Sequence, residues 1–276
     1  MFLTFINDAW HEGNTPILGA MDHAVWLGSS IFDGARSIRG RLPDLRLHLE
    51  RAIRSAELLG LNCPYTVEQM EKLCREGVAK FPSDAELYIR PLIFGTDGLL
   101  IPAKSGFALT LFDAPLPAFS GFSACLSRLQ RPGPLMAPTD AKASCLYPNT
   151  TRALRDAKER GYDNAVVCDV YGNVAEFATA NLFFVDKAGQ VLTPIANGCF
   201  LSGITRARVI GLLATQGIKV EERSVSPDEL ADAQEIFNTG NFAKVLPCTR
   251  YEGRDLPIGP IATLARKLYL EFMETE

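Results

Sequence analysis

The most informative stretch of the chain is Leu201-Ser202-Gly203-Ile204-Thr205-Arg206. The pattern of apolar residues predicts a helix over 205–216 that ends just before Gly217. The quoted stretch places a glycine and backbone amides at the start of this helix. Helix N-termini attract anions, because their first N–H groups lack partners within the helix and the macrodipole is positive there. An ordinary capped helix would show the same residues, so this stretch alone leaves an anion site and a plain helix start both open.

Helix and strand patterns are mixed irregularly on both sides of this stretch. Without regular βαβ alternation, the chain is predicted to be α+β with antiparallel strand pairing. A Pro-rich segment predicts a smaller N-terminal α/β domain (1–113), a linker (114–122) and a larger C-terminal domain (123–276). Further helices are predicted over 47–61, 66–81, 149–160, 227–233 and from 261 onward, and strands over 86–94, 106–112, 123–129, 165–169 and 181–185, the last two followed by hairpin turns.

Composition and charge exclude several classes of protein. The 276 residues are 47% hydrophobic with a net charge of −4, which is typical of a soluble globular protein without a broad nucleic-acid-binding face. We expect neither a signal peptide nor a membrane span, because no basic start precedes a long apolar run. Seven cysteines without CxxC spacing and three scattered histidines predict no metal site and reduced thiols, which favours the cytoplasm.

Several separated motifs resemble those of the class IV aminotransferases, and several motifs in the right order are far more specific than any one alone. Upstream, His48-Leu49-Glu50-Arg51 and Tyr88-Ile89-Arg90-Pro91 resemble the branched-chain amino acid aminotransferases in particular, so the resemblance covers nearly the whole chain. The later motifs are Lys142-Ala143-Ser144-Cys145-Leu146-Tyr147, Gly161-Tyr162-Asp163, Asp169-Val170-Tyr171-Gly172-Asn173-Val174-Ala175-Glu176, Asn181-Leu182-Phe183, Thr193-Pro194, Gly203-Ile204-Thr205-Arg206, Asp232-Ala233-Gln234-Glu235-Ile236-Phe237 and Thr239-Gly240.

The resemblance implies the fold type IV architecture, with pyridoxal 5'-phosphate (PLP) in the cleft between two domains. Lys142 resembles the lysine that holds PLP as a Schiff base and, once freed, shuttles a proton at the substrate. Glu176 resembles the carboxylate that pairs with the pyridine nitrogen. Arg51 resembles the arginine that binds the phosphate, for which a guanidinium is a natural bidentate donor. Without the flanking motifs, each of the three would be interpreted as an ordinary surface charge.

The other site residues follow from the same resemblance. Tyr147 lies where the family has a tyrosine near the phenolic oxygen of PLP, and Leu201 would pack on the ring, although a plain core role is the alternative for both. Arg131 resembles a family arginine that we interpret as structural. Phosphate contacts are implied for Gly203, Ile204, Thr205 and Asn241, and substrate contacts for Phe32, Tyr88, Arg90 and Phe242.

Departures from the family pattern cluster in the expected substrate pocket. Asn241 and Phe242 stand where branched-chain enzymes typically have Thr and Ala, and Phe177 stands where the family has a small residue. Leu27 replaces a tyrosine typical of branched-chain enzymes. If the phenyl rings point into the pocket, they could shift the preference to another amino acid or to an amine. The alternative is that both rings turn into the core.

The expected function is PLP-dependent transamination, in which a homodimer moves an amino group from a hydrophobic or branched-chain amino acid to 2-oxoglutarate by a ping-pong mechanism. Alternatives are an amine or D-amino-acid transaminase, and an enzyme similar to aminodeoxychorismate lyase that would use the same lysine for elimination. A non-catalytic PLP-binding protein is a further alternative. Retention of both Lys142 and Glu176 argues against it, because such a protein needs no proton shuttle.

Overall fold

The computed structural model describes residues 1–276 and divides into two compact units. The first unit contains Met1–Leu116, Ala141–Cys145 and Glu276, and the second contains Pro117–Asp140 and Leu146–Thr275. The short segment Ala141–Cys145 therefore packs with the N-terminal part of the chain, although it is separated from that part in sequence. Lys142 lies in this segment and belongs to the first unit.

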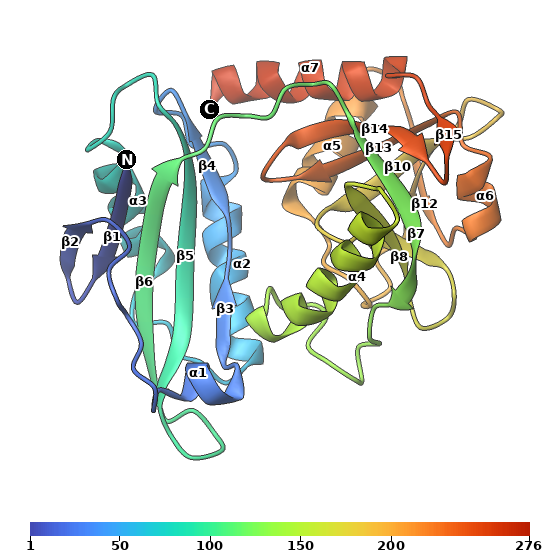
Figure 1. The fold of residues 1–276 in the computed structure, drawn as a ribbon. Coiled ribbons are helices and arrows are strands. Elements are labelled where there is room, and N and C mark those ends of the chain that lie inside the picture. The colour runs from blue at the N-terminus through green and yellow to red at the C-terminus, as the bar shows by residue number, and fades with distance from the viewer. The chain divides into compact units, whose positions relative to one another are not determined.

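The first unit is built on a six-stranded antiparallel sheet in the order β2-β1-β6-β5-β3, with β4 also paired to β5 (Figure 1). The long hairpin of β5 and β6 forms its centre. The strands are β1 (Phe2–Ile6), β2 (Ala9–Glu12), β3 (Ser30–Phe32), β4 (Ala35–Ile38), β5 (Glu86–Asp97) and β6 (Lys104–Asp113), and the helices are α1 (His23–Leu27), α2 (Leu45–Leu58) and α3 (Val67–Val78).

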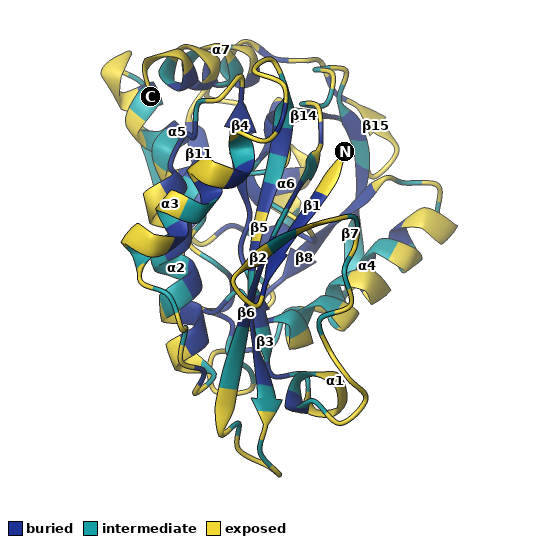
Figure 2. Ribbon diagram, turned by 90° about the vertical axis from the view of Figure 1, so that its left-hand side faces the viewer, coloured by how far each residue is buried: buried dark blue, intermediate teal, exposed yellow.

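Helices α2 and α3 pack against each other and against this sheet, and their outer turns are exposed (Figure 2). The predicted amphipathic face of α2 is confirmed, because Leu49, Ala52 and Ala56 are fully buried. The predicted cap of α3 is also confirmed. Thr66 accepts a hydrogen bond from the Gln69 amide at 3.3 Å, while the Gln69 side chain accepts one from the Thr66 amide at 2.8 Å. This capping box fixes where α3 begins.

The second unit is built on a nine-stranded sheet in the order β12-β11-β10-β13-β14-β7-β8-β9, with β15 paired to β14. Its strands are β7 (Phe122–Gln130), β8 (Asn164–Cys168), β9 (Val174–Phe177), β10 (Asn181–Val185), β11 (Val191–Pro194), β12 (Val220–Arg223), β13 (Glu235–Gly240), β14 (Lys244–Tyr251) and β15 (Arg254–Asp255). The 3₁₀ turn η1 (Ser144–Leu146) leads into α4 (Tyr147–Glu159), and the other helices are α5 (Ile204–Thr215), α6 (Pro227–Ala231) and α7 (Pro260–Thr275).

The α+β prediction is confirmed, but the prediction of antiparallel pairing was wrong for part of the second sheet. The pairs β7–β8, β11–β12 and β14–β7 are parallel. Parallel neighbours need a crossover connection. Helix α4 supplies one between β7 and β8, and α5 supplies one between β11 and β12. The hairpin turns that can be recognised in the sequence join antiparallel neighbours only, so they give no sign of the parallel pairs.

The main core of the second unit decides where Phe177 points. Its side chain is fully buried, and its ring lies edge-on to Phe122 with centroids 5.1 Å apart. Both belong to a cluster that includes Leu182, Ile236 and Leu230. Phe177 is therefore a core residue, as the alternative interpretation of the sequence held.

None of the helices is both long and apolar enough to cross a membrane.

Candidate active site

The backbone around Lys142 is fixed by contacts within the first unit. The Lys142 amide donates to the Ser55 hydroxyl on α2 at 3.0 Å, and the Lys142 carbonyl accepts from the Phe32 amide at 3.2 Å. Ala143 forms a bridge to Ile31 on β3. The Lys142 ammonium lies 5.1 Å from the centre of the Phe32 ring. Lys142 thus projects from a rigid segment rather than from an exposed loop.

Arg51 is oriented by a buried carboxylate that the sequence analysis did not single out. The Asp33 side chain is fully buried and accepts from Arg51 Nε at 2.7 Å, Arg51 Nη2 at 2.9 Å and His48 Nδ1 at 2.8 Å. Burial alone would raise the pKa of Asp33, but the charge and hydrogen bonds of Arg51, together with His48, hold it well below its usual range. The Asp33 carboxylate, ionised at neutral pH, therefore fixes the plane of the Arg51 guanidinium.

The predicted substrate residues of the first unit form one stack. The Arg90 guanidinium lies 5.8 Å from the centre of the Phe32 ring and 5.5 Å from those of Tyr88 and Phe112. Gly34 is needed beside this stack, because a β-carbon there would lie 2.0 Å from the Tyr88 hydroxyl. The structure thus brings Phe32, Tyr88 and Arg90 together, and the Phe32 ring links them to Lys142.

In the second unit, Glu176 near the end of β9 is held on both oxygens. Arg131 Nη1 lies 2.9 Å from Oε1, and Asn181 Nδ2 donates to Oε2 at 3.1 Å. The same Asn181 nitrogen donates to the Leu201 carbonyl at 3.0 Å, which ties the carboxylate to the stretch before α5. Arg131, interpreted from the sequence only as structural, is an ion-pair partner of the predicted pyridine-binding residue.

The start of α5 has the features expected of an anion site. The helix begins at Ile204 with Gly203 as its N-cap, and no side chain caps it. Thr205 is buried in its first turn. Gly203 also permits a close approach, because a β-carbon there would lie 1.9 Å from the Asn181 side-chain oxygen. The amides of this first turn are suited to an oxygen-rich anion such as a phosphate.

Gly203→Ala is expected to weaken PLP binding by about tenfold, because the new methyl group displaces Asn181 and with it a charge-assisted hydrogen bond to Glu176. The matched control is Gly211→Ala in the same helix, where a β-carbon meets no atom within 4 Å. That control should bind PLP normally and stabilise the protein, by about 0.5–1 kcal/mol. Fluorescence titration of the apoproteins measures both affinities. Equal PLP affinity in the two variants would contradict the role of Asn181.

The turn after β13 carries a buried hydroxyl that suits a ligand. Thr239 is 1% exposed, and its Oγ1 has no hydrogen-bond partner in the protein. Thr239 pairs directly opposite Asn181, so both side chains lie on one face of the sheet. A buried polar atom without a partner is costly unless something else binds it. The residues of this face therefore fit the phosphate-bearing cofactor that the sequence implies.

The remaining predicted site residues are Tyr147, Leu201, Asn241 and Phe242, all in the second unit. Tyr147 begins α4 and is half-buried, as is Leu201. Asn241 and Phe242 form the turn between β13 and β14, and Phe242 is 58% exposed. Phe242 borders a pocket of about 410 Å³, whose other lining residues include Phe122 and Leu246. Phe242, unlike Phe177, is thus not part of the core.

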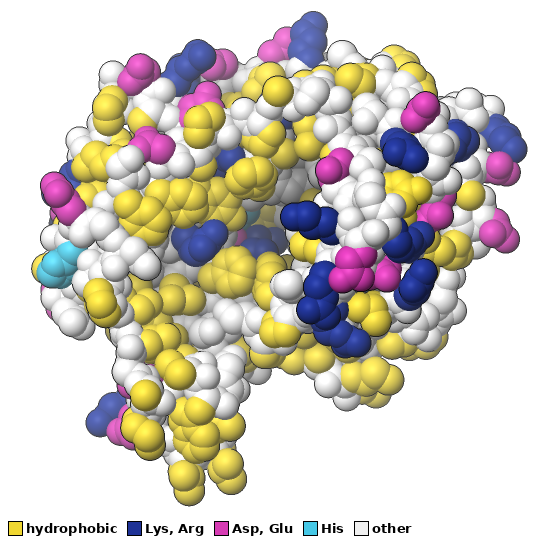
Figure 3. Space-filling view, in the orientation of Figure 1, with side chains coloured by type: hydrophobic (Ala, Val, Ile, Leu, Met, Phe, Trp, Pro, Cys, Tyr) yellow, Lys and Arg dark blue, Asp and Glu magenta, His cyan; other side chains and the backbone are white.

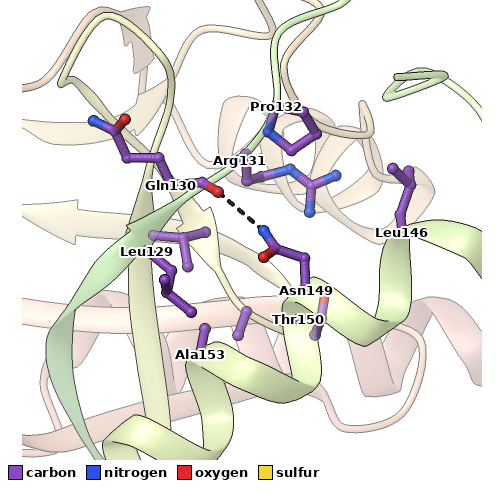
Figure 4. Close-up of a pocket in the computed structure, with 10 residues that line it drawn as sticks. Leu129, Gln130, Arg131, Pro132, Leu146, Asn149, Thr150 and Ala153 are labelled. Atoms are coloured by element: carbon purple, nitrogen blue, oxygen red, sulfur yellow. Dashed lines mark hydrogen bonds between the residues drawn. The ribbon is translucent and has the colours of Figure 1, made fainter. Parts of the chain in front are cut away.

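Two other hollows of the second unit do not compete as the reaction site. The cavity beside Arg131 and Asn149 measures only about 10 Å³, and Asn149 Nδ2 donates to the Gln130 carbonyl at its edge at 3.0 Å (Figure 4). Such a space holds one water at most. Lys and Arg side chains also gather over α4 (Figure 3). On that helix Arg152 and Arg155 border an open surface hollow that Asp156 and Glu159 also line.

The chain matches known proteins over most of its length. Residues 30–251 match the family described as Amino-transferase class IV. The probable branched-chain-amino-acid aminotransferase of Rickettsia bellii is 35% identical over 231 residues, covering 82% of this chain and 79% of the relative. The branched-chain-amino-acid aminotransferase of Escherichia coli is 29% identical over 277 residues, covering 95% of this chain and 88% of the relative.

Solved structures agree with these matches. The crystal structure of an aminotransferase from Brucella abortus bound to PLP has a TM-score of 0.97 and 44% identity, and covers 99% of both chains. A branched-chain aminotransferase from Thermoproteus uzoniensis, solved with norvaline, has a TM-score of 0.93 and 28% identity, with 99% and 95% covered. The resemblance seen in the sequence motifs is confirmed: the chain belongs to the class IV aminotransferase family and is a PLP-dependent transaminase.

Proposed function

We propose that this transaminase takes an amino group from a hydrophobic or branched-chain amino acid and passes it to 2-oxoglutarate by a ping-pong mechanism. The observation that carries the proposal is the environment of Arg90, which stacks on three aromatic rings and makes no ion pair with a protein carboxylate. A guanidinium held in this way suits the carboxylate of an amino acid or a keto acid. The names of the relatives from Rickettsia bellii and Escherichia coli support the donor class.

The chemistry divides among a few side chains. When bound, PLP supplies an electron sink that makes the proton on the substrate Cα removable. Lys142 would hold the cofactor covalently and, when freed, would move that proton. Glu176, held by Arg131 and Asn181, keeps a proton on the pyridine nitrogen. Tyr147 would donate to the phenolic oxygen of PLP, and Leu201 would exclude water from the ring.

Three parts of the chain bind the phosphate: Arg51, the first turn of α5 and the turn after β13. Arg51 brings a guanidinium already oriented by Asp33. Gly203, Ile204 and Thr205 offer backbone amides and a hydroxyl at an uncapped helix start. Asn241 offers a side-chain amide. Each is a donor-rich group, as a phosphate dianion requires.

The assembly and location of the enzyme are part of the same proposal. The proposed domains are 1–113 and 123–276, joined by 114–122, with the segment Ala141–Cys145 of the second domain packed in the first compact unit. A homodimer is the working unit, in keeping with the family and with the frequency of two-fold symmetry. The cytoplasm is the compartment, in keeping with seven unpaired cysteines. Sedimentation of a fully active monomer at micromolar concentration would exclude the dimer.

The donor class is tested with purified protein, PLP, 2-oxoglutarate and a panel of L- and D-amino acids and amines. We expect glutamate to form fastest with L-leucine, L-isoleucine and L-valine. Faster reaction with D-amino acids or amines would overturn the donor class but not the transaminase assignment. A new product released without any keto acid would indicate elimination instead.

Phe242→Ala is expected to change the ranking of donors by about tenfold between large and small side chains, while the visible spectrum of bound PLP stays the same. The exposed position of Phe242 at the turn gives the physical reason, because truncation there opens space without removing core packing. Tyr171→Ala, at another exposed aromatic, is the control and should leave the ranking unchanged. A uniform fall in rate for every donor would show that Phe242 does not select substrates.

A further inference from the structure

Lys244 combines two unfavourable features at one position. It is the first residue of β14, its side chain is fully buried, and its backbone has a left-handed φ of 62°. Lysine is rarely buried completely, and left-handed backbone is adopted at low cost mainly by glycine. A residue that bears both costs in a well-packed unit indicates a specific role for its side chain.

The Lys244 side chain is directed at the turn that carries Asn241. Its Nζ donates to Asn241 Oδ1 at 2.7 Å and lies 5.1 Å from the centre of the fully buried Tyr269 ring on α7. The backbone of the turn has a separate support. Arg266 Nη1 donates to the carbonyls of Ala243 and, at 3.0 Å, of Val245. The ammonium of Lys244 therefore holds the Asn241 side chain, while Arg266 supports the backbone of the turn.

The chemistry of the two groups fixes which way the Asn241 amide faces. An ammonium has three donors and no acceptor, so only the oxygen of the amide satisfies this contact. The amide is planar, and its nitrogen lies on the opposite side of the carbonyl carbon. Fixing the oxygen on Lys244 therefore fixes the direction in which the nitrogen presents its two N–H donors. Without the lysine, the amide could rotate and present its oxygen instead, which repels an anion.

We propose that Lys244 is a positioning residue that locks the Asn241 amide so that its nitrogen donates to the phosphate of PLP. The proposal rests on the proposed function, in which Asn241 serves the phosphate. It adds a residue that touches neither cofactor nor substrate and acts on the phosphate through Asn241. Asn241 stands where branched-chain enzymes typically have a threonine. A threonine hydroxyl rotates to suit its ligand, whereas an amide needs its orientation set.

Lys244→Met tests this, because methionine keeps an unbranched side chain of similar length and removes the donor. We expect the dissociation constant of PLP for the apoprotein to rise about fivefold, the effect of one hydrogen bond lost. Pyridoxal, which lacks the phosphate, should bind as it does to wild type. In an Asn241→Ala background, Lys244→Met should have no further effect, since the group through which it acts is gone. Lys267→Met, at an exposed lysine on α7, is the matched control and should change neither constant.

The outcomes separate this proposal from the proposed function. The proposal is overturned if Lys244→Met weakens the binding of pyridoxal and of PLP equally, because the lysine then supports the fold. It is also overturned if Lys244→Met has its full effect on PLP binding in the Asn241→Ala background. If Lys244→Met does not fold, Lys244→Leu is measured in the same way, and failure of both variants to fold also overturns it. If wild-type protein binds pyridoxal and PLP equally, the phosphate assignments of the proposed function fail first.

Discussion

Lys142→Ala is expected to reduce turnover by at least about a thousandfold, because it removes both the amine that binds PLP and the group that moves the proton. PLP should remain bound noncovalently through its phosphate and ring contacts. The visible absorption of the lysine-bound cofactor should disappear and be replaced by that of free PLP. Steady-state rates and the absorption spectrum of the dialysed protein measure the two effects separately.

The variant should fold, because the contacts that fix this segment use the Lys142 backbone. Its amide donates to Ser55 and its carbonyl accepts from Phe32, and neither contact depends on the side chain. The contact of the ammonium with the Phe32 ring is lost, which is worth about 0.5–1 kcal/mol. Lys104→Ala, at an exposed lysine of the same unit, is the control and should retain full activity. Turnover within tenfold of wild type in Lys142→Ala would assign the catalytic lysine elsewhere.

Local features of the fold could be predicted because short-range chemistry determines them. The capping box of Thr66 and Gln69 and the glycine before α5 are signals within four residues of the boundaries that they set. The order of motifs identified the family without any contact information. The capping box and the glycine act within a single turn of chain, and the structure begins α3 and α5 where these two signals predict.

Features that depend on distant contacts could not be predicted. Nothing near Ala141–Cys145 shows that it packs with the first unit, or that β7 and β8 pair in parallel. Arg131 lies 45 residues before its partner Glu176 in the sequence, so their ion pair could not be seen there. The role of Asp33 appears only once α2 packs beside β3. The predicted residues were therefore those with family motifs, and the missed ones are the partners that hold them in place.

Asp33→Asn is expected to destabilise the protein by about 3 kcal/mol and to weaken PLP binding through Arg51. Asparagine has the shape of aspartate but turns one acceptor oxygen into a donor that faces Arg51 and His48. Breaking a buried ion pair by changing one partner leaves the other charge uncompensated, which costs about 3–5 kcal/mol. Urea unfolding at neutral pH measures the loss of stability. Asp97→Asn, at an exposed acid of the same unit, is the control and should have little effect.

The pH dependence of this difference gives a second, independent test. The folded pKa of Asp33 lies well below its unfolded value of about 3.9, so its contribution to stability is complete above that pH. As the pH falls below about 4, the unfolded chain takes up a proton that the folded protein does not, and the contribution shrinks by about 1.4 kcal/mol per pH unit. The stabilities of wild type and Asp33→Asn should therefore converge in acid and differ most at neutral pH. A difference that stays constant from neutral pH down to about pH 3 would mean that Asp33 is not the ionised partner of Arg51, because only a carboxylate with a lowered pKa loses its advantage in that range.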